Sequence, residues 1–201
     1  MSLVTLVIIF NQLLNCKTFM KIYKQIISFI LIIFLNNSIY SSEMIIGEEK
    51  IEPGINIIFE GAIRDDVAPS DFFLSESETD VHLEALINWS NDAPNGSPKG
   101  GFIPYLNVEA HVKNKRTKIE KKFLLTPHIN ISDNFHYAIN IKLPGRINDK
   151  YDITFTIFPP IEEKLGYHFD WRESYNYPLI QPFLFEYKDL DFKKIAISKR
   201  R

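Results

Sequence analysis

The sequence predicts an all-β domain, an immunoglobulin-like antiparallel β-sandwich of about seven strands, preceded by a signal peptide. Apolar and polar residues alternate from Met44 onward, which is the pattern of half-buried strands. Asn, Pro and Gly interrupt this alternation at short intervals, and no segment has the 3.6-residue period of an amphipathic helix. A chain of 201 residues, 45% of them hydrophobic, can bury one good core, so we expect one domain.

Seven segments alternate clearly enough to be predicted as strands. In chain order their apolar residues are Ile55, Ile57, Phe59 and Ile63; Val81, Leu83, Ala85, Ile87 and Trp89; Phe102, Leu106, Val108, Ala110 and Val112; Phe123 to Leu125; Phe135, Tyr137, Ile139, Ile141 and Leu143; Tyr151, Ile153, Phe155 and Ile157; and Phe183, Phe185 and Tyr187. Ile103 and Tyr105 are expected to face away from the core. Seven short strands separated by regular turn signals favour two packed antiparallel sheets.

The connections between these strands are predicted from their turn residues. Residues 90–101 are rich in Asn, Pro and Gly and must form a loop. The basic segment 113–118 is expected to be a solvated hairpin tip. Thr126 and Pro127 are expected to end the fourth strand, which would place His128 in the following loop. Residues 161–182 are irregular and aromatic.

Residues 1–42 have the composition of an export signal. Met20 is followed by Lys21 and Lys24, then by an apolar run over residues 26–35 and by small serines, which is the order found in signal peptides. Residues 1–19 add a second apolar run, so Met20 is a candidate for the true first residue. An uncleaved membrane anchor is the alternative. We therefore expect a signal peptide region at 1–42 and one metal-binding domain at 43–201.

Charge and cysteine content narrow the class of function. Residues 43–201 hold all 25 acidic residues and 20 of the 23 basic ones, and an excess of negative charge argues against nucleic-acid binding. Cys16 is the one cysteine, so the domain cannot depend on disulfides or thiolate ligands. The sequence shows no nucleophile elbow and no phosphate-binding glycine loop, and we do not expect an enzyme.

A histidine and a carboxylate two residues apart provide the main functional clue. His82 and Glu84 alternate with Val81, Leu83 and Ala85, so both point to the polar face of one strand, about 7 Å apart. Such a pair can share one metal ion. By itself it is more often a surface pair, and His111 on another strand is read as a surface residue.

Five short motifs in one order give this pair a context. DVHLEA, PNGSPKGGFIPYL, LTPH, FHYAINI and GYHFD together resemble the bacterial periplasmic iron-transport proteins encoded beside an iron permease. The resemblance spans about residues 54–188. It implies an immunoglobulin-like fold, a homodimer, binding of copper or a similar divalent ion, and a role in high-affinity iron uptake.

The resemblance implies metal ligands at four positions and a departure at a fifth. The family's ligands fall on His82, Glu84, His136 and His168, while His128 stands where the family usually has a methionine. Imidazole and carboxylate suit divalent ions, whereas a thioether favours Cu(I), so we expect a site of nitrogen and oxygen donors. Cu2+ is the expected ion and iron the second, with occupancy falling below about pH 6 as histidines become protonated.

The expected function is a periplasmic metal-binding protein, carrying copper or iron, that assists an inner-membrane iron permease. Two alternatives remain open at this point. One is a metal-free immunoglobulin-like module for adhesion or assembly, in which the histidines are surface residues. The other is a redox protein that oxidises or reduces iron at a copper centre.

Overall fold

The computed structural model describes residues 43–175 and 177–199 of the chain. The predicted signal peptide at residues 1–42, together with the candidate start at Met20, lies outside the described residues. Within the described part, no helix combines the length and the apolar character needed to cross a membrane.

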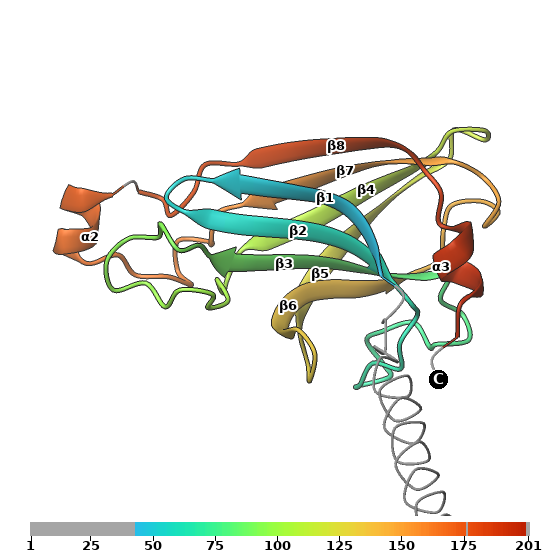
Figure 1. Ribbon diagram of the computed structural model, residues 1–201, viewed down its shortest axis with the longest axis horizontal. Coiled ribbons are helices and arrows are strands. Elements are labelled where there is room, and N and C mark those ends of the chain that lie inside the picture. Colours follow the sequence, from blue (N-terminus) through green and yellow to red (C-terminus); the bar gives the residue numbers. More distant parts are fainter. Residues whose placement is uncertain (1–42, 176, 200–201) are drawn as a thin grey trace, which may run out of the picture. The chain divides into compact units, whose positions relative to one another are not determined.

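The described residues form an antiparallel sheet of eight strands with two short helices. The strands are β1 (Met44–Ile51), β2 (Ile55–Ala62), β3 (Val81–Trp89), β4 (Asn107–Asn114), β5 (Glu120–Asn130), β6 (Asn134–Ile141), β7 (Tyr151–Phe158) and β8 (Phe183–Leu190), and the helices are α2 (Phe169–Ser174) and α3 (Lys193–Ile197). The strand order is β1-β2-β3-β6-β5-β4-β7-β8 (Figure 1). The predicted all-β antiparallel class is confirmed, and β1 is a strand that was not among the seven predicted.

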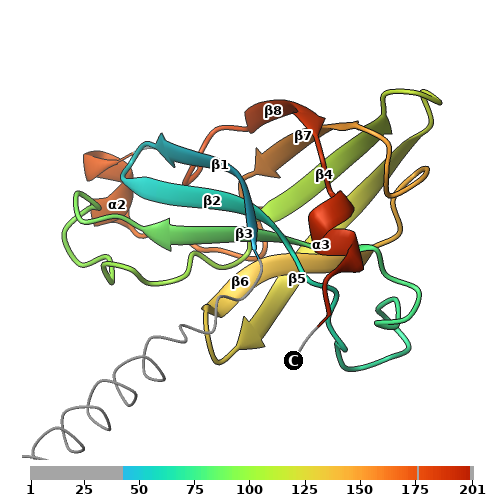
Figure 2. The ribbon, with the colours of Figure 1, turned by 45° about the vertical axis from the view of Figure 1, so that its right-hand side comes forward.

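Strand β5 connects the two halves of the sheet. Its first half pairs with β4, ending at Val108 opposite Leu125, and its second half pairs with β6 from Thr126 onward. The strand therefore turns from one half of the sheet into the other, as Figure 2 shows. Because one strand belongs to both halves, the sheet curls on itself, and a sandwich of immunoglobulin type is not confirmed.

The core lies between the two halves of the curled sheet. Phe59 of β2 stacks on Phe155 of β7 with ring centroids 4.1 Å apart, and both side chains are fully buried. At the open side, Tyr187 of β8 donates a hydrogen bond from its hydroxyl to Glu49 Oε1 of β1 at 2.8 Å. A side chain at Gly47 of β1 would collide with the Tyr187 ring. The two edge strands thus approach each other, and the sheet is nearly closed.

Two predictions from the sequence are wrong. One concerns a segment that is not a regular strand, and the other concerns a strand that is longer than predicted. Ile103 was expected to face away from the core, but it is 1% exposed. Its segment is held to β3 by an isolated bridge at Phe102 and by the bond from Ile103 N to Ile87 O, so strict alternation does not apply. Pro127 was expected to end a strand, but it lies within β5.

Candidate metal centre

His82 and Glu84 lie on β3, and the face that they share is buried rather than open to solvent. Strand β3 is central in its half of the sheet, between β2 and β6, and its first five residues are all buried. His82 is 4% exposed and Glu84 is 5% exposed. The predicted alternation of faces is therefore correct, but the polar face is covered. Burying a charge or a polar group is costly without partners, so this face requires an explanation.

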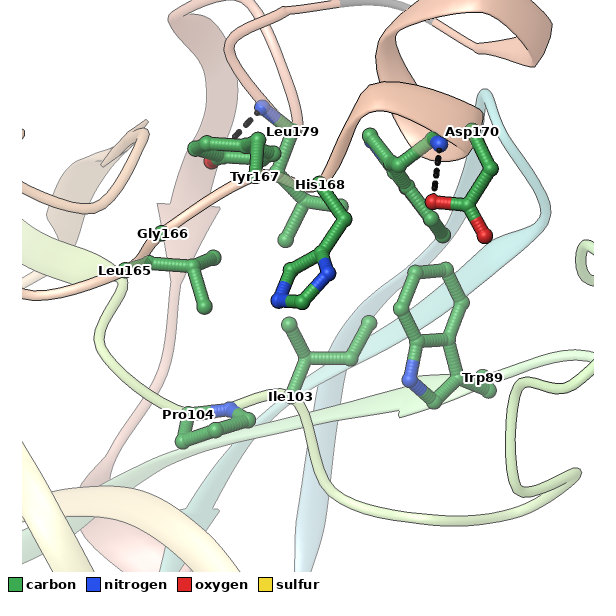
Figure 3. Close-up of a pocket in the computed structure, with 10 residues that line it drawn as sticks. Trp89, Ile103, Pro104, Leu165, Gly166, Tyr167, His168, Asp170 and Leu179 are labelled. Atoms are coloured by element: carbon green, nitrogen blue, oxygen red, sulfur yellow. Dashed lines mark hydrogen bonds between the residues drawn. The ribbon is translucent and has the colours of Figure 1, made fainter.

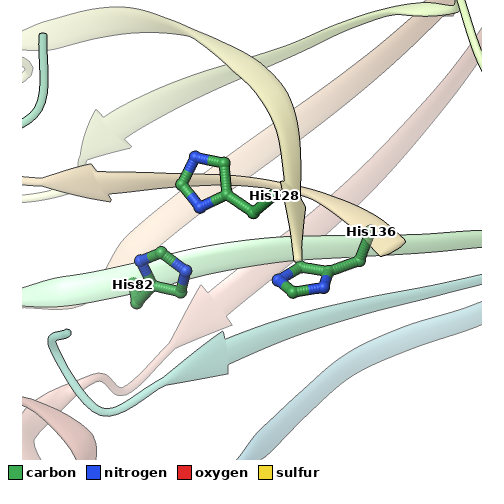
Figure 4. A group of neighbouring side chains, drawn as sticks. All are labelled: His82, His128 and His136. Atoms are coloured by element: carbon green, nitrogen blue, oxygen red, sulfur yellow. The ribbon is translucent and has the colours of Figure 1, made fainter. Parts of the chain in front are cut away.

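Two further histidines reach the same place, one from the adjacent strand β6 and one from β5 beyond it. His128 of β5 lies directly opposite His136 of β6 in the strand register, so the two side chains share a face. The sequence analysis placed His128 in a loop, and this is corrected because β5 continues through Pro127. One ligand atom from each of His82, His128 and His136 lies within 4.8 Å of the others (Figure 4). These three residues form the histidine cluster.

Glu84 adds a carboxylate to the histidine cluster. Its Oε1 lies 3.5 Å from His82 Nε2 and 3.9 Å from His136 Nε2. Its second oxygen, Oε2, is buried without a hydrogen-bond partner, and so is His128 Nε2. Buried polar atoms almost always have partners. Unpartnered atoms on an imidazole and on a carboxylate of the same site fit the donor set of a bound cation.

Hydrogen bonds on the far side of two rings direct their other nitrogens into the cluster. His136 Nδ1 lies 3.2 Å from the backbone oxygen of Asn134, which can only accept, so Nδ1 donates and Nε2 keeps its lone pair. His82 Nδ1 lies 2.7 Å from Asn140 Oδ1. In both rings Nε2 is therefore the nitrogen nearer to Glu84.

Burial also sets the protonation of the site. It lowers the pKa of His128 to about 4, with the neighbouring His82 and His136 adding to the effect, and it lowers the pKa of His82. It raises the pKa of Glu84 to about 8, helped by the negative charges of Asp133 and Glu60. Near neutral pH the two imidazoles are therefore neutral, as a metal ligand must be, and Glu84 holds a proton that a cation would displace.

A cavity of about 330 Å³ gives access to the histidine cluster. One wall comes from Asp65–Ala68 and Phe73, which belong to the long connection between β2 and β3, and the other from Pro127–Asn130 of β5. Phe73 packs edge-on against His128, with ring centroids 5.0 Å apart. The cavity is large enough to admit a hydrated ion, and His82, His128 and His136 all line it.

His168 does not join the histidine cluster within one chain. It is exposed, precedes helix α2, and lines a separate, mainly apolar cavity with Trp89, Ile103 and Trp171 (Figure 3). One chain thus brings together four of the five predicted ligands. His111, predicted to be a surface residue, is partly exposed on β4. Its Nε2 lies 3.1 Å from Glu120 Oε2.

Two buried polar residues of the site were not identified from the sequence. Asn140 is 2% exposed and contacts His82, which it faces across the β3–β6 pair. Glu60 is 5% exposed and faces Glu84 across the β2–β3 pair, and burial raises its pKa to about 7. Asn140 follows His136 at an even spacing, which places both on one face, but only the strand pairing shows what that face meets.

A nearly closed antiparallel sheet with a buried cluster of three imidazoles and one carboxylate defines an all-β protein of the metal-binding class. The comparisons with known proteins give the family. The profile of the family described as Fe2+ transport protein matches residues 40–194, so the chain belongs to this family.

Individual relatives agree with the family. A UPF0423 protein of Brucella abortus (strain 2308) is 29% identical over 154 residues, covering 74% of this chain and 81% of the relative. A copper-bound variant of Campylobacter jejuni P19 is 31% identical, with a TM-score of 0.63 over 74% of this chain and 96% of that one. A copper-bound variant of FetP from uropathogenic Escherichia coli strain F11 is 27% identical, with a TM-score of 0.62 over 73% and 95%.

Proposed function

We propose that the chain is a periplasmic metal-binding protein that holds Cu2+ at His82, Glu84, His128 and His136 and assists high-affinity iron uptake. One observation carries the proposal. Three imidazoles lie close together, two of them within 4 Å of the buried Glu84 carboxylate, and its oxygen Oε2 has no hydrogen-bond partner. A divalent cation would satisfy this atom and the orphaned nitrogen of His128 together.

The donor set favours Cu2+ as the resident ion. Neutral imidazole and carboxylate are ligands of Cu(II), Zn(II), Ni(II) and Fe(II), whereas thioether sulfur selects Cu(I). Met44 is the one methionine of residues 43–201, and it lies at the start of β1. The similar P19 and FetP structures are copper-bound, which supports copper among these candidates. Iron is the second ion of the proposal, as the cargo rather than the resident metal.

The cellular role rests on the family and on the expected leader. An Fe2+ transport family supports a function beside an inner-membrane iron permease, to which the protein would present iron. A FetP protein similar to this chain was obtained by expression in a periplasm. Residues 1–42 would direct export as a signal peptide, and residues 43–201 would form the single functional domain.

A homodimer would bring His168 into the metal centre. His168 is exposed, and Phe169 beside it is 69% exposed. Ile129 near the end of β5 and Ile131 in the connection to β6 are also exposed, close in sequence to His128 and His136. Docking these two apolar surfaces between copies would place His168 of one copy beside the histidine cluster of the other.

Metal analysis of the purified protein tests the proposed site. The parent protein, loaded with Cu2+ and passed through a desalting column, is expected to retain copper. His82→Ala combined with His136→Ala is expected to lose it, because two of the four donors are gone. His111→Ala is the matched control, since it removes a histidine outside the cluster and should leave the copper content unchanged.

The same analysis separates the proposed function from the metal-free alternative. An adhesion or assembly module would retain no copper in the parent protein. If the double variant retains as much copper as the parent, the histidine cluster is not the binding site. The uptake role is tested by growth in low iron: deleting the gene should slow growth, and the parent gene, but not the double variant, should restore it.

A further inference from the structure

The side chain of Asn140 contacts both the histidine cluster and the segment that covers it. Asn140 lies on β6 directly opposite His82 of β3, and it is almost completely buried. Its Oδ1 lies 2.7 Å from His82 Nδ1. Its Nδ2 lies 2.8 Å from the backbone oxygen of Asp65 and 2.8 Å from that of Leu74, both in the connection between β2 and β3.

These contacts permit one orientation of the Asn140 amide. Backbone oxygens only accept hydrogen bonds, so the atom facing Asp65 and Leu74 must be the amide nitrogen. Its two protons are donated to these two oxygens. The flipped amide would place its oxygen 2.8 Å from two other oxygens, and three acceptors would repel one another. The amide oxygen therefore faces His82.

The orientation of the amide determines the tautomer of His82. Because Asn140 Oδ1 can only accept, His82 Nδ1 must carry the proton and donate it. A neutral His82 then has its lone pair on Nε2, the nitrogen that lies 3.5 Å from Glu84 Oε1. In the other tautomer, Nε2 would carry a hydrogen and could not bind a metal ion.

We infer that Asn140 is a positioning residue that holds His82 in the Nδ1–H tautomer, with the Nε2 lone pair directed into the metal centre, and that it anchors the covering segment with the same amide. The inference rests on the proposed metal site and adds a residue to it. Removing the residue that hydrogen-bonds the other ring nitrogen of a metal-binding histidine typically weakens metal affinity by about 10- to 100-fold.

Two substitutions separate the two roles of the amide. Asn140→Asp keeps an oxygen that can accept from His82 Nδ1 but offers no proton to the oxygens of Asp65 and Leu74. It should keep the tautomer while loosening the covering segment. Asn140→Leu removes the acceptor as well, so His82 is expected to populate both tautomers. Asn107→Leu is the matched control, because Asn107 on β4 donates to Pro159 O and contacts no member of the histidine cluster.

The test is two-bond 1H–15N NMR of the histidine rings in the metal-free protein at pH 8, combined with Cu2+ titrations. The parent should show His82 as the Nδ1–H tautomer. Asn140→Leu should show both tautomers and about 10- to 100-fold weaker Cu2+ binding, while Asn107→Leu matches the parent. A parent His82 with the proton on Nε2, or a folded Asn140→Leu protein with parental affinity, would overturn the inference.

The spectrum of the parent protein tests the predicted tautomer of His82 even if Asn140→Leu does not fold, because this measurement needs no variant. It also distinguishes this inference from the proposed function. A parent protein that shows the Nδ1–H tautomer but binds no Cu2+ would contradict the metal site and leave the role of Asn140 toward His82 in place.

Discussion

Glu84 combines two properties that make it the central residue of the site. It lies within 4 Å of Nε2 of both His82 and His136, and burial together with nearby carboxylates raises its pKa to about 8. Without a metal ion, the proton on Glu84 removes the charge of this buried carboxylate. With one, the carboxylate is ionised and offsets part of the charge of the cation.

Copper binding is therefore expected to release a proton from Glu84. Because a carboxylate binds a cation and a carboxylic acid does not, Cu2+ must displace this proton at every pH below about 8. The Cu2+ affinity should rise up to about tenfold per pH unit from pH 7 toward 8 and then level off. Isothermal titration calorimetry in buffers of different ionisation enthalpy measures the proton directly.

Glu84→Gln serves as the control for proton release. It keeps the shape of the side chain but has no proton to lose, so its Cu2+ affinity should be weaker and nearly flat over the same pH interval. Equal proton release by the parent and by Glu84→Gln would show that another group supplies the proton.

His128→Met tests the effect of having a histidine where the family usually has a methionine. A thioether is a softer donor than imidazole, so the substitution should raise the affinity for Cu(I) relative to Cu(II). Competition with chromophoric Cu(I) and Cu(II) chelators gives both affinities. An unchanged ratio would mean that His128 does not contact the ion, despite its orphaned Nε2.

At the scale of the strand, β3 shows how the core holds the site. Val81, Leu83 and Ala85 fill one face and are completely buried, and His82 and Glu84 fill the other. Leu83→Ala should lower the free energy of unfolding by about 2–5 kcal/mol, since it leaves a cavity in the core. Denaturant unfolding of the metal-free protein measures this loss.

Leu184→Ala on β8 is the matched control for the core substitution. Leu184 is 59% exposed, so its loss should change the free energy of unfolding by no more than about 0.5 kcal/mol. Equal losses for the two variants would contradict the inward orientation of Leu83, and with it the face assigned to His82 and Glu84.

Strand β3 could be predicted from the sequence, whereas β5 could not be predicted in full. Alternation in DVHLEALINW fixes which residues share a face, because successive side chains in a strand point to opposite sides. Pro127 is a strong signal for the end of a strand because it lacks an N–H group. In the structure Pro127 lies close to the point where β5 changes its pairing partner from β4 to β6, and a change of partner within one strand leaves no local signal in the sequence.

The same limit explains which parts of the site were found. His82 and Glu84 follow from spacing within one strand, and His128, His136 and His168 came from the resemblance to a family. Asn140 and Glu60 were missed because their importance arises from the strands beside them, through the β3–β6 and β2–β3 pairs. Burial of the polar face was also missed, because the covering segment 63–80 has no pattern that places it.

At the scale of the whole molecule, one chain leaves His168 apart from the other proposed ligands. The proposed homodimer is expected to give a solution mass of twice that of the chain, measured by light scattering. His168→Ala should keep this mass, because the apolar surfaces remain, while Cu2+ affinity falls by about tenfold or more with the loss of one ligand. A monomeric protein that binds Cu2+ with the same affinity after His168→Ala would remove His168 from the site.

The most direct test of the central claim is a crystal structure of the Cu2+-loaded protein with anomalous diffraction measured at the copper absorption edge. We predict a copper peak within about 2.0–2.2 Å of ring nitrogens of His82, His128 and His136, in contact with Glu84. A copper peak elsewhere on the protein, or none at the histidine cluster, would contradict the claim.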